Sequence, residues 1–306
     1  MKEKLLKNNT LIIFLLLLIG SSLVSDSFLS GNNLQNLLRQ VAPIGLVSIG
    51  MFLVILTGGI DLSVGSILAF IGVAFAILSY EVYFAAAIAI VLLLGIGIGA
   101  ISGYLVAYQR MAPFIATLAL MTIVRGAGFL ASKGAPISVG EHSAAIMYLG
   151  TGSIFGIPVS ALLFFGLFIA VFVLLKYHVV GRHIIAIGSN EEAVRLSGIS
   201  VERTKCLVYI ISGFLTALAA LMVVGRTGVG SPNIGIGMEL DAIAAVVIGG
   251  TSLAGGRGSV FFTLLGVFIL GMIGNIMNLL DVTAYLQQLI KGIIIILAVL
   301  FQKRSI

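Results

Sequence analysis

The chain has 306 residues, of which 60% are hydrophobic and only 9% are charged, and its formal net charge is +6. This number of charged residues is too small to cover the surface of a water-soluble protein. The composition therefore excludes a soluble enzyme and indicates a polytopic membrane protein. The positive charge suits cytoplasmic loops, and no basic helix or basic-aromatic array indicates nucleic acid binding. The single cysteine, Cys206, excludes an internal disulfide, and the scattered histidines predict no metal site.

Ten apolar stretches, separated by charges or by Gly, Pro and Asn, approach the roughly 20 residues that a membrane-spanning helix needs. In chain order they cover Leu11–Phe28, Val41–Thr57, Ser63–Tyr80, Phe84–Tyr108, Pro113–Ala131, Ile157–Tyr177, Lys205–Gly225, Leu240–Ala254, Ser259–Leu280 and Ala284–Phe301. The eighth is short for a complete crossing. We therefore predict one all-α transmembrane domain over residues 1–306, with about ten helices, several of them interrupted by glycine.

The first stretch has two interpretations, because lysines followed by an apolar run and then small residues also describe a secretory signal peptide. The distribution of charge favours an uncleaved first helix with a cytoplasmic N-terminus. With ten crossings, the outer side receives Arg39, Lys133 and Arg226, the spans contain Arg125 and Lys291, and every other lysine and arginine falls on the inner side. This bias follows the positive-inside rule and predicts that both termini are cytoplasmic.

Two connections are longer than the others, the outer one at residues 132–156 and the inner one at residues 178–204. The inner connection contains the string GSNEEAVRLSGIS, which predicts a short helix. Ser189 or Asn190 is suited to cap it, Glu191 and Glu192 suit its first turn, and Gly198 suits its end. A short, charged, capped helix between membrane spans indicates a docking element, and the alternative is a solvated amphipathic turn.

The motifs of soluble catalysis are absent from the sequence. No G-x-x-x-x-G-K-[ST] phosphate loop is present, and the chain contains no Gly-Lys dipeptide. Neither a metal-binding His/Glu motif, a nucleophile elbow nor a dinucleotide fingerprint occurs in a suitable context. The sequence therefore predicts that this chain does not hydrolyse ATP and is not an enzyme, which leaves transport or signalling.

Three long strings give the sequence a specific resemblance. They are GGIDLSVGS at residues 58–66, GSNEEAVRLSGI at 188–199 and ELDAIAAVVIGGTSLAGGRG at 239–258, supported by FIATL at 114–118, RG at 125–126 and YLQQLIKG at 285–292. The chain resembles the membrane-spanning permease subunits of ABC importers for monosaccharides, and the ribose permeases most of all, over nearly its whole length. Met238 and Asp281 depart from the family's pattern, which affects the identity of the sugar rather than the fold.

The resemblance implies a permease of the bacterial cytoplasmic membrane in which two copies form a central pathway. Two cytoplasmic ATP-binding cassette subunits use ATP, this chain binds no cofactor or metal, and an extracytoplasmic binding protein delivers the sugar. The same resemblance assigns the contact with the ATPase to the inner connection, at Asn190, Glu191, Glu192, Ala193, Arg195, Leu196 and Gly198. Alternative interpretations are a permease for another pentose or hexose, a furanosyl signal molecule or a nucleoside, and a polytopic receptor or scaffold.

Candidate residues of the translocation pathway are the polar side chains that lie within or beside apolar stretches, namely Asp61, Ser63, Asn275, Asn278 and Gln287. For Asp61 and Ser63 we favour capping of the third stretch over direct contact with sugar, since a broken helix needs its backbone N–H groups satisfied. The amides are equally suited to line a pathway or to join neighbouring helices.

Two cations within the spans, Arg125 and Lys291, require partners or water, and Glu239 and Asp241 are candidate counter-charges. The glycine-rich stretch at residues 249–258 permits either a close approach of helices or a re-entrant bend. We expect the first of these two roles.

Overall fold

The computed structural model of the chain describes residues 2–140 and 144–303. Residues 1, 141–143 and 304–306, which belong to the predicted single domain and in part to its outer connection, lie outside the described residues. Seven helices of the described part are long and apolar enough to cross a membrane: α2 (Gly31–Leu56), α3 (Val64–Glu81), α4 (Phe84–Ala107), α5 (Pro113–Ser132), α7 (Val159–Tyr177), α10 (Val201–Thr227) and α12 (Val260–Leu279). The chain is therefore an all-α membrane protein, as its composition predicts.

The other helices are α1 (Lys2–Val24), α6 (Ala144–Thr151), α8 (Val179–Ser189), α9 (Glu191–Leu196), α11 (Met238–Ile248) and α13 (Ala284–Lys303). Two of the connections also contain short antiparallel strand pairs. The first pairs β1 (Ile137–Ser138) with β4 (Val229–Gly230), and the second pairs β2 (Ser153–Ile154) with β3 (Ile157–Pro158). The outer connection holds α6, and the inner one holds α8 in addition to the predicted short helix α9, so both are more structured than the sequence predicts.

Most of the predicted spans agree with helices to within a few residues, and three differ clearly. The first begins at Lys2 instead of Leu11 and ends at Val24 instead of Phe28. The second begins at Gly31 instead of Val41, because the Ser30 side chain accepts the N–H of Asn33 and caps the helix ten residues earlier. The prediction of the eighth span, Leu240–Ala254, is wrong as a continuous helix. Its helix, α11, ends at Ile248 and is followed by Gly250 in the left-handed region, with φ of 78°.

With 11 residues, α11 extends about 16 Å, roughly half the thickness of a bilayer's hydrocarbon core. Residues 231–237, between β4 and α11, form turns rather than helix. The strand β4 pairs with β1, and after α11 the N–H of Gly256 donates to the carbonyl oxygen of Leu56 at 3.0 Å. The predicted eighth span is therefore a broken segment, with turns at residues 231–237 followed by the short helix α11.

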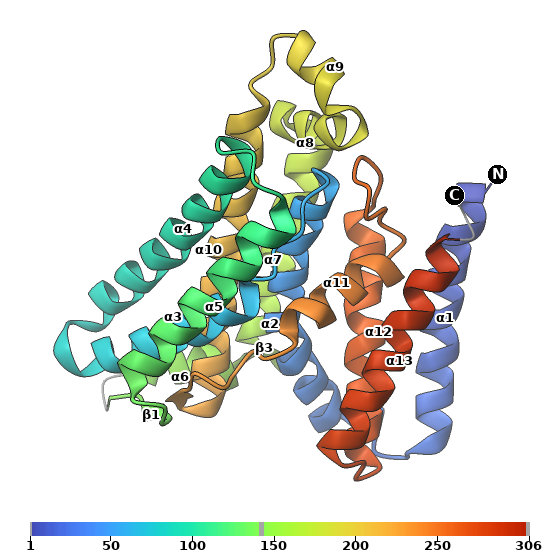
Figure 1. Ribbon diagram of the computed structural model, residues 1–306. Helices are drawn as coiled ribbons and strands as arrows, with labels where there is room; N and C mark the ends of the chain where they lie inside the picture. Colours follow the sequence, from blue (N-terminus) through green and yellow to red (C-terminus); the bar gives the residue numbers. More distant parts are fainter. Residues whose placement is uncertain (1, 141–143, 304–306) are drawn as a thin grey trace.

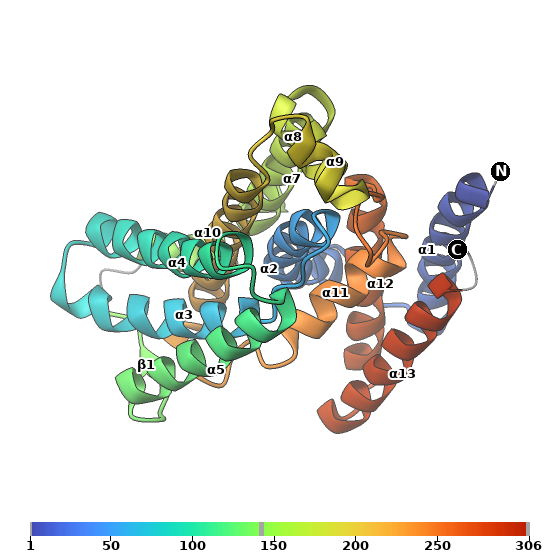
Figure 2. The same cartoon turned by 45° about the horizontal axis from the view of Figure 1, so that its top comes forward.

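The helix α2 forms the centre of the bundle. Of its apolar 18-residue stretch, 78% is buried inside the protein, compared with 22% of the corresponding stretch of α4. Figure 2 shows α2 surrounded by α10, α7, α11 and α12, while α4 and α5 lie further out on one side and α1 and α13 on the other. The buried face of this central helix is a nearly continuous apolar run from Leu46 to Leu56, interrupted by Ser48 and Gly50. A helix that is apolar all round is expected at the centre of a membrane bundle.

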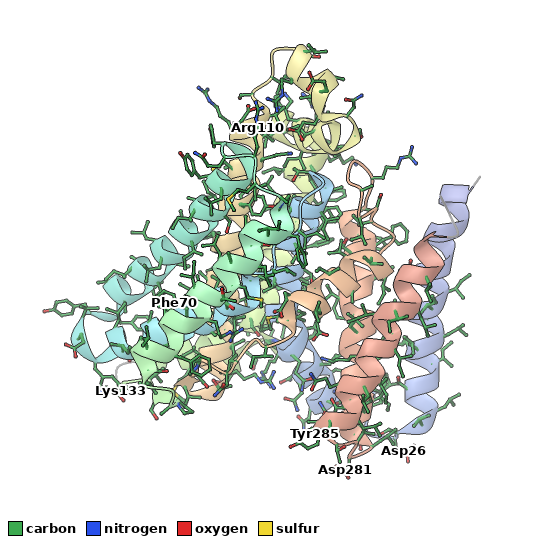
Figure 3. The ribbon with its side chains drawn as sticks, viewed as in Figure 1. Asp26, Phe70, Arg110, Lys133, Asp281 and Tyr285 are labelled. Carbon is green, nitrogen blue, oxygen red and sulfur yellow. The ribbon has the colours of Figure 1, made fainter. Side chains whose placement is uncertain are left out.

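The ends of the bundle carry different elements (Figure 1). Figure 3 places Arg110 at the end where α8 and α9 lie, and Asp26, Lys133, Asp281 and Tyr285 at the opposite end. Because Asp26 follows α1 and Tyr285 lies at the start of α13, α1 begins and α13 ends toward the end with α9. We call these the α9 end and the Lys133 end.

Glycines bring α4 and α10 into close contact. Gly95, Gly99 and Gly103 recur every four residues on the buried face of α4, opposite Gly213 of α10. A Cβ atom at Gly99 would overlap the carbonyl oxygen of Tyr209, and one at Gly213 would overlap that of Gly95. Small residues at this spacing allow two membrane helices to pack backbone to backbone.

This packing predicts that Gly99→Ala destabilises the protein by about 1–3 kcal/mol, the usual range for overfilling a packed contact. The matched control is Gly97→Ala on the same helix, because a Cβ there would meet nothing within 4 Å. Thermal unfolding of the purified protein in detergent compares the two variants. Equal midpoints for both variants would contradict the glycine contact.

Candidate functional site

The inner connection contains the short helix that its sequence predicts. The Asn190 side chain accepts the N–H of Ala193 at 3.0 Å and caps α9, and the two glutamates occupy its first turn. The helix ends at Ser197, after which Gly198 adopts a positive φ of 77°. The predicted cap, acidic first turn and terminating glycine are all confirmed as local structure.

Ion pairs fasten α9 to the start of α10. Arg195 contacts Glu191 at 3.0 Å and Glu202 at 2.9 Å, and Lys205 contacts Glu191 at 2.5 Å. Burial alone would raise the pKa of Glu191, but the hydrogen bonds and charges of Lys205 and Arg195 outweigh it and lower that pKa below the ordinary 4.5. The Glu191 carboxylate is therefore held ionised, and Arg195 points toward its own chain.

Another face of α9 is exposed, although Glu192 on it lies 3.9 Å from Arg195. Val194 is 7% exposed and packs with Ile187 and Val201, whereas Leu196 is 80% exposed and the Glu192 side chain is 73% exposed. Glu192 and Leu196 are spaced i and i+4, so they share one face of the helix. This face is the part of α9 that is available to another protein.

A junction of glycines joins α8 to two other elements at the α9 end. A Cβ at Gly188 would overlap the carbonyl oxygen of Leu56, at the end of α2, and the backbone nitrogen of Gly256, between α11 and α12. Gly256 in turn donates its N–H to Leu56, and the Ser189 hydroxyl lies 3.5 Å from the Gly256 carbonyl oxygen. The close approach expected for residues 249–258 is confirmed, and its partners are α8 and α2.

Asp61 lies in the connection between α2 and α3 and is 0% exposed. Its Oδ1 atom accepts the backbone N–H of Ser63 at 3.0 Å and the Ser63 hydroxyl at 2.5 Å, and its Oδ2 accepts the Ser212 hydroxyl of α10 at 3.2 Å. Ser63 forms no side-chain cap of its own. Asp61 thus bonds the backbone just before α3, while its role as a cap of that helix stays a prediction, and Ser63 acts as a donor.

The amide candidates form two separate pairs. Asn275 is 3% exposed and exchanges two hydrogen bonds of 2.9 Å with Asn33, joining α12 to α2. Asn278 is exposed and accepts from Gln287 at 2.8 Å, near the start of α13. The five predicted pathway candidates therefore lie in three different places and do not form one site.

The cations inside the spans both have partners. Lys291 of α13 pairs with Asp241 of α11 at 2.8 Å, which confirms that counter-charge. Arg125 of α5 donates from Nη1 to the carbonyl oxygens of Pro232 and Ile234, each at 2.7 Å, and from Nε to the Ser66 hydroxyl at 3.2 Å. Its guanidinium thus binds the turns that precede α11, a role for which the sequence carries no local signal.

A helical membrane bundle that contains an interrupted apolar segment is typical of membrane transport proteins. Residues 33–299 match the family described as "Branched-chain amino acid transport system / permease component". The chain belongs to this family of permease components.

Several full-length relatives are similar to the chain. The ribose import permease protein RbsC of Escherichia coli strain K12 is 43% identical over 99% of this chain and 96% of its own length. RbsC of Bacillus subtilis strain 168 is 44% identical over 95% and 90%, and the L-arabinose transport system permease protein AraH of Escherichia coli strain K12 is 35% identical over 96% and 89%. No solved structure matches the chain. The chain is a multi-pass transport subunit of the bacterial inner membrane.

The Asp61 network predicts different effects for two substitutions. Asp61→Ala leaves the Ser63 N–H and two buried hydroxyls without their acceptor, and each such loss costs about 1–3 kcal/mol of unfolding free energy. Asp61→Asn keeps an acceptor for Ser63 and places an amide against Ser212, so we expect a smaller effect. Thermal unfolding in detergent and ligand uptake are measured together. If Asp61→Asn unfolds normally but abolishes uptake, the charge itself has a transport role and the capping interpretation is wrong.

Proposed function

We propose that this chain is the membrane-spanning subunit of an ATP-driven importer of a monosaccharide, with ribose as the first candidate. The observation that carries the proposal is similarity over nearly the whole chain, at 43–44% identity, to permeases named for ribose import. The related arabinose permease of Escherichia coli strain K12 is less similar, at 35% identity. The family description names branched-chain amino acids, but these full-length relatives are named for pentoses.

In this proposal the energy comes from separate subunits. A cytoplasmic ATP-binding cassette subunit hydrolyses ATP, an extracytoplasmic sugar-binding protein supplies the ligand, and a second copy of the permease completes the pathway. The absence of a phosphate loop in the sequence supports this division of labour. The exposed face of α9 at Glu192 and Leu196 supports docking of the ATP-binding subunit.

We further propose ten crossings with both termini in the cytoplasm. Seven long helices, α1, α13 and the broken segment at residues 231–248 together provide them. The α9 end carries Arg110, α8, α9 and the loop with Arg257, so the positive-inside rule supports a cytoplasmic α9 end. The Lys133 end then faces the binding protein.

Uptake of labelled D-ribose tests the substrate. Cells that lack this gene, supplied with the protein from a plasmid, are expected to regain uptake at low micromolar ribose, and excess unlabelled ribose should abolish it. Excess xylose and galactose are the specificity controls. Normal membrane expression without ribose uptake would transfer the assignment to another small ligand, such as a different sugar or a nucleoside.

The docking role of α9 is tested at Leu196. Burying this side chain against a partner is worth about 1.5–3 kcal/mol, so Leu196→Asp is expected to lower sugar-stimulated ATPase activity of the complex by roughly tenfold or more. Leu196→Met, which keeps an apolar side chain of similar size, is the matched control. Arg195 is unsuitable for this test because its ion pairs hold α9 to its own chain. ATPase stimulation that survives Leu196→Asp would reject the assignment and favour the receptor or scaffold alternative.

A further inference from the structure

The starts of two helices meet in the interior of the bundle. Gly65, in the first turn of α3, lies so close to the start of α11 that a Cβ there would overlap the carbonyl oxygen of Gly235 and the Glu239 carboxylate. The helix α11 lies between α5 and α13 in both views of the ribbon (Figures 1 and 2). A pocket of about 440 Å³ opens at this point, lined by Ser66, Met121, Thr122, Arg125, Gly126, Phe129, Ile236 and Glu239. Its volume falls within the range of small-molecule sites.

Two charged side chains of the pocket retain unused hydrogen-bonding capacity. The bonds of Arg125 to Ser66 and to the backbone use Nε and Nη1, and none of the hydrogen bonds within the described residues uses Nη2. The Oε2 atom of Glu239 is buried and has no hydrogen-bond partner among the same residues. A donor and an acceptor therefore face one cavity without satisfying each other, which is costly unless a ligand or water binds between them.

The position of the pocket beside a membrane-spanning helix limits what can lie against its opening. Arginine and glutamate inside a membrane span are tolerated where they face a water-filled cavity or another protein chain, and not where they face lipid tails. Since the pocket opens on the surface of the chain between α5 and α11, this surface lines either an aqueous pathway or a contact between copies. The first of these roles agrees with the unsatisfied atoms, because a contact between protein chains normally pairs its buried charges.

The charges around the start of α11 point to a neutral ligand. Glu239 and Asp241 lie in its first turn, Arg125 approaches from α5, and Lys291 approaches from α13 to pair with Asp241. Two acids and two bases leave no net charge to attract an anion or a cation. A carboxylate acceptor and a guanidinium donor, set beside Met121, Phe129 and Ile236, match the alternating hydroxyl groups and C–H faces of a sugar.

We propose that this pocket is a monosaccharide subsite within the membrane, in which Glu239 accepts and Arg125 donates hydrogen bonds to sugar hydroxyls. The assignment rests on the proposed function and adds to it the place where the ligand passes this chain. Few polar groups in an open pocket give a weak and transient contact, as release to the cytoplasm requires.

The test measures sugar transported per ATP hydrolysed in proteoliposomes that contain the permease, its ATPase and the loaded binding protein. Glu239→Gln keeps the side chain's size but replaces the accepting oxygen by a donor at one position. Loss of a charged hydrogen bond to the ligand weakens its contact by about tenfold, so we expect the ratio to fall at least fivefold while sugar-stimulated ATPase activity persists. Asp26→Asn, an exposed acid-to-amide change at the Lys133 end, is the matched control.

A second variant reduces the free volume of the pocket and leaves the side chains of Glu239 and Arg125 unchanged. Ile236 is 67% exposed at the pocket, so Ile236→Trp fills the space without removing a buried contact. It is expected to lower the same ratio while ATPase stimulation is retained.

The outcomes separate the two levels of the proposal. A wild-type complex that hydrolyses ATP in response to loaded binding protein but imports no sugar overturns the proposed function and the subsite with it. Sugar import by the wild type, together with unchanged ratios in Glu239→Gln and Ile236→Trp, overturns the subsite alone. Loss of assembly between permease copies in both variants also overturns it and assigns the surface to a contact between copies.

Discussion

The constraint on which the rest of this structure depends is the need to bond the backbone polar groups that two helix interruptions leave inside an apolar bundle. Backbone N–H and C=O groups outside a helix need other partners when they are buried. Before α3, the Asp61 carboxylate accepts the N–H of Ser63, and before α11 the Arg125 guanidinium donates to the carbonyl oxygens of Pro232 and Ile234. Acidic side chains in the first turn of α11 suit the positive end of its dipole.

The interruptions also give the α9 end a physical connection to the centre of the bundle. The backbone of Gly188 contacts both Leu56, the last residue of α2 before the connection to α3, and Gly256, in the loop that follows α11. These contacts join backbone to backbone, so no flexible side chain separates α8 from the two connections. The glycines explain the close approach, since any larger residue would separate the three segments. An ATPase docked on α9 would thus act on both broken segments from one contact.

Two kinds of polar group can be distinguished inside the bundle by whether their bonding capacity is used. Asn33 and Asn275 exchange a complete pair of hydrogen bonds, and Lys291 is matched by Asp241, so these residues hold helices together. Arg125 and Glu239 face the same pocket with capacity left over. Satisfied groups are expected where a protein is rigid, and unsatisfied groups are expected where ligand or water passes. This distinction separates helix packing from a pathway better than residue type alone.

The sequence by itself determined the membrane class, the family, most span boundaries and the whole of α9, because these depend on composition, on motifs or on signals within a few residues of one another. Asn190, the acidic first turn and Gly198 all act locally, so their roles follow from their order in the chain. Only the tertiary structure decided that α11 is a short helix ending at Ile248, that Asp61 accepts a hydrogen bond from Ser212, and that the amide candidates form separate pairs. The pocket at Arg125 and Glu239 also belongs to this second group. Its lining comes from α3, α5 and the start of α11, and a close contact at Gly65 brings α3 and α11 together. A contact between residues so far apart in the chain cannot be predicted from the spacing of residues in the sequence.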